Sequence, residues 1–116
     1  MTDTEAEALG RRLVACKGFR VMRGMLDMQG RTWGRDLLWR WRDDLDVPDL
    51  RDPATLGCVL ALVREAWGQK AVTSFWGYYW EVDYAHTIVD ESMEHKQLAH
   101  GDTEAEALVA ALEAAP

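Results

Sequence analysis

The chain has 116 residues, of which 48% are hydrophobic and 28% are charged, and its formal net charge at pH 7 is −7. Such a length accommodates one domain, residues 1–116, and such a composition excludes a disordered chain. The acidic balance argues against a general nucleic-acid binder.

The charge is unevenly distributed along the chain. Residues 11–42 contain nine Arg and Lys residues against two Asp residues, whereas residues 43–116 contain four basic and fifteen acidic side chains. The basic third can therefore build a local anion site although the protein as a whole is acidic.

Cysteine usage and the N-terminus indicate the compartment. Cys16 and Cys58 lie far apart, and the acidic N-terminus lacks the pattern of a secretory signal. The longest apolar run, at 56–63, is too short to cross a membrane. We expect an intracellular protein with free thiols and no membrane partner.

The heptapeptide DTEAEAL occurs twice, at 3–9 and at 102–108. In both copies a threonine, Thr4 or Thr103, precedes a glutamate by three residues, which is the spacing of a capping box. We interpret the repeat as two similar helix starts, because the similarity fades after the shared leucine. The first helix is predicted at about 5–16, with an inward face of Ala6, Leu9, Leu13 and Cys16 and an end at Gly18.

Residues 19–42 are predicted to form three short strands, with turns at Arg23-Gly24, Gln29-Gly30 and Gly34. The clearest strand is DLLWRWR at 36–42, whose alternation puts Trp39 and Trp41 on one face.

Arginine and tryptophan interleave in RTWGRDLLWRWR at 31–42. Guanidinium groups bind phosphates and tryptophan rings stack on bases, so this segment is suited to a small anionic nucleotide. The structural alternative buries the tryptophans in the core and leaves the arginines solvated. The candidate anion-binding residues are Arg31, Trp33, Arg35, Arg40 and Arg42.

An acidic linker, DDLDVPDLRD at 43–52, follows. Asp43, Asp44 and Asp46 could contact a partner protein as a mimic of nucleic-acid charge, although acidic linkers are usually only solvated.

The second helix is predicted after Asp52, which caps it, and Pro53, which occupies its first position, with Gly68 at its end. Its predicted buried stripe comprises Leu56, Val59, Leu60, Val63 and Trp67.

The remaining chain is predicted to form a three-stranded meander, at about 71–76, 79–88 and 94–100, with turns at 77–78 and 90–92. A final helix is expected at 104–114. The order α-β-β-β-α-β-β-β-α indicates an α+β protein, with small antiparallel sheets packed on three helices.

Aromatic residues crowd the stretch SFWGYYWEVDY at 74–84. Exposed Trp and Tyr side chains are typical of protein-recognition sites, so Trp76, Tyr78 and Tyr79 are candidate partner-binding residues. The alternative packs Trp76, Trp80, Val82 and Tyr84 against the helices.

Other polar side chains suggest no clear chemistry. His86, His95 and His100, with Glu91 and Glu94, lack a recognised metal-binding spacing, and Glu81 and Asp83 share a strand face without a nucleophile nearby. We expect no enzyme activity, no metal and no cofactor.

The stretches PDLRDPATLGCVLALVREAWG (48–68) and GDTEAEALVAALEAAP (101–116), with the Gly24-Met25 turn, resemble a family of small accessory proteins of tailed phages and prophages. The resemblance implies a non-essential phage gene product that acts in the cytoplasm of the bacterial host. It supplies no catalytic residue, because the shared positions are those that build helices.

Two functions follow as hypotheses. The first is an anti-defence or host-takeover factor, similar to anti-CRISPR proteins, that inhibits a bacterial defence protein by stoichiometric binding. The second is a sponge for a small anionic nucleotide signal. Opposite charges in the two parts of the chain would also suit a homodimer or a larger homo-oligomer. We expect Arg31→Ala and Arg35→Ala to abolish the second activity and to leave the fold intact.

Overall fold

The computed structural model describes residues 1–32, 47–87 and 93–116. In chain order it contains α1 (Asp3–Val14), α2 (Pro53–Trp67), β1 (Val72–Trp76), β2 (Trp80–Thr87), β3 (Met93–Gly101) and α3 (Glu104–Glu113). The α+β class and the succession of three strands and a closing helix after α2 are confirmed.

Helix α1 begins earlier than its sequence predicts. Thr2, not Thr4, is the N-cap: its hydroxyl accepts from the Glu5 backbone N–H, and the Glu5 carboxylate accepts from the Thr2 N–H. The helix ends at Val14 with Ala15 as its C-cap, so Gly18 does not end it. Ala6, Leu9 and Leu13 are buried as predicted.

The described part of the predicted three-strand segment, residues 19–32, forms turns and two isolated bridges. Leu26 pairs with Thr32, and Asp27 pairs with Pro48. The predicted turns at Gly24 and Gly30 are confirmed by positive φ angles at both. Gly34 and the strand at 36–42 lie outside the described residues.

Helix α2 begins and ends where its sequence predicts. The Asp52 carboxylate accepts from the Thr55 N–H, and Gly68 adopts the left-handed conformation at the C-terminal end (φ 64°). The buried stripe differs in part from the prediction, because Thr55 and Leu62 are buried with Val59 and Val63. The predicted members Leu56, Leu60 and Trp67 are only partly buried, since they lie at the edge of the core.

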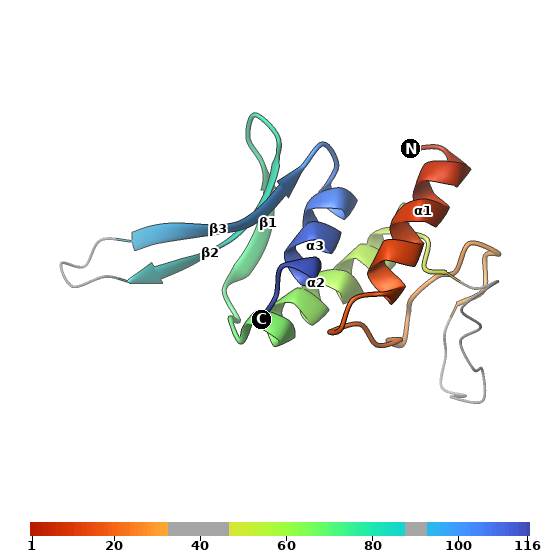
Figure 1. Cartoon of the computed structure of the whole chain (residues 1–116), viewed down its shortest axis with the longest axis horizontal. Coiled ribbons are helices and arrows are strands. Elements are labelled where there is room, and N and C mark those ends of the chain that lie inside the picture. The colour runs from red at the N-terminus through yellow and green to blue at the C-terminus, as the bar shows by residue number, and fades with distance from the viewer. Residues whose placement is uncertain (33–46, 88–92) are drawn as a thin grey trace.

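The three strands form one antiparallel sheet in the order β1-β2-β3. Val72 and Val82 face inward and are fully buried. Figure 1 shows the helices on one side of this sheet, with α3 between the strands and α1, and the β2–β3 hairpin reaching away from the helices. The opposite side of the sheet is not covered by any helix of the described residues.

Among the described residues, no helix combines the length and the apolar character needed to span a bilayer.

Candidate functional site

Four large rings stand exposed at the end of β1 and in the turn that joins it to β2. We call residues 75–79 the aromatic turn. Tyr78 is fully exposed and Trp76 is 60% exposed, while Phe75 and Tyr79 are about 40% exposed. The turn projects at the top of Figure 1, clear of α1 and α2. Trp76, Tyr78 and Tyr79, which the sequence predicts to bind a partner, are all exposed.

Local contacts hold the aromatic turn in a defined shape. The Gly77 N–H donates to the Tyr79 carbonyl at 2.9 Å and closes the turn. The rings of Trp76 and Trp80 lie 5.8 Å apart at an angle of 60°, and Tyr79 lies 4.9 Å from the ring of His100. Both distances are typical of favourable tilted ring pairs. The exposed rings are therefore partly preorganised for binding.

The alternative interpretation of the 74–84 stretch is right for part of it. Val82 is buried, and Trp80 and Tyr84 are partly buried against the core. Trp76 remains mostly exposed although it is the strand partner of Trp80. One face of β2 thus packs on the helices, while the turn beside it does not.

The helix-free side of the sheet carries polar side chains, which strand register places in rows. We call these residues the outer face: Phe75, Glu81 and His100 form one row, Thr73, Asp83 and Gln97 form the next, and His95 follows on β3. Glu81 accepts from the Gln97 amide at 3.1 Å. The sequence correctly puts Glu81 and Asp83 on one face.

Asp83 is buried although it lies on the outer face. The residue is only 5% exposed, beside a β-bulge at Val82/Asp83. Its Oδ1 has no hydrogen-bond partner among the described residues, and its Oδ2 lies 3.6 Å from His95 Nδ1. Burial raises the pKa of Asp83 above its usual range, and His95 opposes this shift. No sequence pattern indicates this burial, because alternation assigns a face and not a depth.

The predicted anion-binding set is described only at Arg31. Its Nε donates to Asp27 Oδ2 at 2.9 Å, and Asp27 is 1% exposed. The backbone N–H groups of Gln29 and Arg31 also donate to Asp27, both at 2.9 Å. The other anion-binding candidates lie outside the described residues: Trp33, Arg35, Arg40 and Arg42. So do the acidic residues predicted to bind a partner: Asp43, Asp44 and Asp46.

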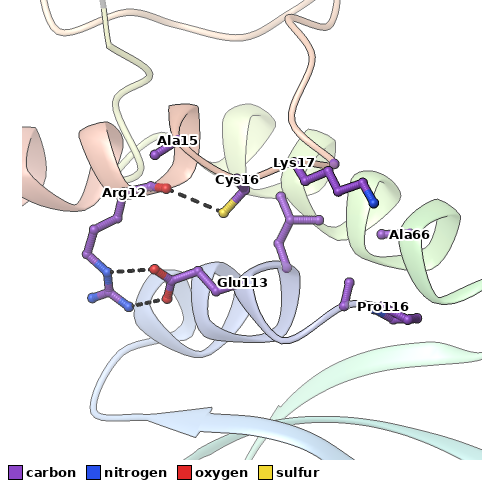
Figure 2. A pocket seen from close by; sticks show the side chains of 10 residues that line it. Arg12, Ala15, Cys16, Lys17, Ala66, Glu113 and Pro116 are labelled. Atoms are coloured by element: carbon purple, nitrogen blue, oxygen red, sulfur yellow. Dashed lines mark hydrogen bonds and ion pairs between the residues drawn. The ribbon is translucent and has the colours of Figure 1, made fainter.

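A pocket of about 360 Å³ lies where the C-terminal ends of α1 and α3 meet. Figure 2 shows Arg12 paired with Glu113 across its rim and the Cys16 thiol donating to the Arg12 carbonyl. Burial, with the nearby Glu113 carboxylate, raises the pKa of Cys16, so the thiol stays protonated near neutral pH. The pocket therefore offers no activated nucleophile at Cys16.

The Cys58 thiol and the histidines are the remaining groups that could take part in chemistry. Burial also raises the pKa of Cys58. His95 and His100 are exposed, and the side chain of His86 lies outside the described set. Within residues 1–32, 47–87 and 93–116, no three His, Cys, Asp or Glu side chains converge in a way that could hold a metal ion.

In comparison with known proteins, no family model, curated protein or solved structure matches the chain.

Proposed function

We propose that this protein acts by binding another protein through the aromatic turn. The observation that carries the proposal is the exposure of Trp76 and Tyr78 on a hairpin whose turn is closed by the Gly77–Tyr79 hydrogen bond. Large exposed rings on a fixed backbone gain much apolar burial on binding and lose little conformational freedom.

The ion pair of Arg31 favours an inhibitor over a nucleotide sponge. The sponge hypothesis needs Arg31 as a phosphate partner, but its guanidinium already bonds a buried carboxylate. Together with the resemblance to phage accessory proteins, this favours a phage-encoded anti-defence factor that occupies a bacterial defence protein stoichiometrically in the host cytoplasm.

Affinity capture from bacterial lysate tests the proposal. The tagged wild type is expected to retain a host protein at a fixed stoichiometry, and Trp76→Ala and Tyr78→Ala are expected to lose it. Lys17→Ala is the matched control, because Lys17 is exposed and lines the pocket instead. The complex should persist in added salt, since apolar contacts are little screened.

Two results would contradict the proposal. Capture that survives both aromatic substitutions would place the interface elsewhere. Loss of capture in Lys17→Ala alone would assign the interaction to the pocket.

A further inference from the structure

Asp83 is the most anomalous polar group among the described residues. It is a carboxylate buried to 95%, and one of its oxygens has no hydrogen-bond donor among residues 1–32, 47–87 and 93–116. Buried carboxylates are normally paired, because a buried charge without a partner loses its hydration and gains nothing in return. Asp83 Oδ1 has almost no accessible surface, so a donor from a partner protein can satisfy it only once a neighbouring side chain moves.

The surroundings of Asp83 specify the charge of that donor. Glu81 is the next residue of the same face on β2, and no Lys or Arg occupies a position that the register assigns to the outer face. Lys96 pairs with Tyr84 and so belongs to the opposite face. Within the described strands, the outer face therefore carries two carboxylates and two histidines but no lysine or arginine.

The aromatic residues beside these carboxylates favour one kind of cation. Phe75 is the cross-strand partner of Glu81, and the Tyr79 ring contacts His100 in the same row. A guanidinium group can donate two parallel hydrogen bonds to a carboxylate and stack on an aromatic ring, whereas an ammonium group cannot do both.

We propose that the outer face binds an arginine side chain presented by the partner protein, with Asp83 as the principal acceptor and Glu81 as its neighbour. This inference rests on the proposed function, because the outer face adjoins the aromatic turn and a protein seated on the turn can reach it. The His95 ring lies beside Asp83 and is itself largely exposed, so it can rotate away at small cost as the guanidinium enters.

A peptide titration tests this inference independently of any lysate. The probe is a short peptide of alternating glycine and arginine, added to the full chain while backbone amide shifts are followed by NMR. The controls are the same peptide with citrulline, an uncharged analogue, and the same peptide with lysine. We expect the arginine peptide to shift the amides of Thr73, Glu81, Asp83 and Gln97, and to bind more tightly than either control.

Variants separate a specific site from general charge attraction. Asp83→Asn keeps the side-chain shape and is expected to weaken binding of the arginine peptide about tenfold. Asp102→Asn removes the same charge from an exposed position off the face and should change affinity less than about twofold. Equal weakening in both variants, equal binding of the citrulline peptide, or shifts confined to other regions would each overturn the inference.

The two proposals can fail separately. Trp76→Ala is expected to abolish protein capture while leaving the shift at Asp83 with the arginine peptide in place. Peptide binding without any captured protein would refute the proposed function alone. Capture that depends on Trp76 but is unaffected by Asp83→Asn would refute the arginine site alone.

Discussion

Arg31 and Asp27 form an ion pair whose two partners differ sharply in burial. Asp27 Oδ2 lies 2.9 Å from Arg31 Nε, and the aspartate side chain is 1% exposed while that of the arginine is 44% exposed. The arginine thus neutralises a charge that the fold has already removed from water. This gives Arg31 a structural role in the turn between Asp27 and Thr32.

Arg31→Ala should therefore destabilise the protein rather than leave the fold intact. We expect a loss of about 1–3 kcal/mol in the free energy of unfolding, because a hydrogen bond to a buried charged group is removed. Urea denaturation measures it, with the exposed Arg23→Ala as the control, expected within about 0.5 kcal/mol of wild type. Equal stability of Arg31→Ala would show that backbone N–H groups alone satisfy Asp27.

Asp83→Asn should stabilise the protein in a pH-dependent way. The folded-state pKa of Asp83 is raised above its ordinary value of 3.8, so its contribution to stability is greatest below that pH and falls as pH rises through the folded pKa. The advantage of the variant should be absent at low pH and grow toward neutrality. Thermal unfolding of both proteins, followed from about pH 3 to about pH 8, measures the difference in stability. An advantage largest at low pH would contradict the assignment.

Substitutions in the aromatic turn should leave the fold intact. Tyr78 is fully exposed, so Tyr78→Ala is expected to change the free energy of unfolding by less than about 0.5 kcal/mol. Leu108→Ala, at a fully buried position, is expected to cost about 2–5 kcal/mol. Denaturant unfolding compares them. A large loss in Tyr78→Ala would mean that its ring has a packing role, and capture experiments with that variant would then report on folding.

The Cys16 thiol should react slowly. Its raised pKa leaves little thiolate at neutral pH, and Glu113 contributes to that rise. Alkylation by iodoacetamide, followed by mass spectrometry, should be slower for Cys16 in the folded protein than in denaturant. Glu113→Gln should speed it, although the bond to Arg12 is also weakened. Faster labelling of the folded wild type than of the denatured chain would refute the shift.

The two copies of DTEAEAL begin their helices two residues out of step. In the second copy Thr103 is the N-cap and accepts from the Glu106 N–H. Thr103→Ala should cost about 1 kcal/mol, whereas Thr4→Ala, inside α1, should cost much less. Thermal unfolding distinguishes them, and an equal loss in both variants would mean that Thr4 supports α1 in another way.

An element could be predicted from the sequence where the physical signal that sets its limits is local. The limits of α2 were predictable because Asp52, Pro53 and Gly68 act on their immediate neighbours. The start of α1 was not, because the choice between Thr2 and Thr4 depends on the residue before the repeat. In the second copy that residue is Gly101, which has no capping side chain and belongs to β3.

The candidate site, too, could be predicted only in its local features. The composition of the 74–84 stretch indicated a recognition surface, and the alternation of β2 correctly assigned Glu81 and Asp83 to one face. The exposure of Trp76 and the burial of Asp83 depend on how distant parts of the chain pack around them. Such tertiary relations are not encoded in a local window of sequence.

Helix α3 contacts all three strands and both other helices, yet it follows every one of them in the chain. During synthesis the ribosome releases the partners of Leu108 and Val109 before it releases those residues themselves. Until α3 is present, the apolar faces of α1, α2 and the sheet lack most of their packing partners, although α2 and β1 contact each other directly. The core can therefore assemble only after residues 104–113 have left the exit tunnel, and a nascent chain halted before that point is a natural substrate for chaperones.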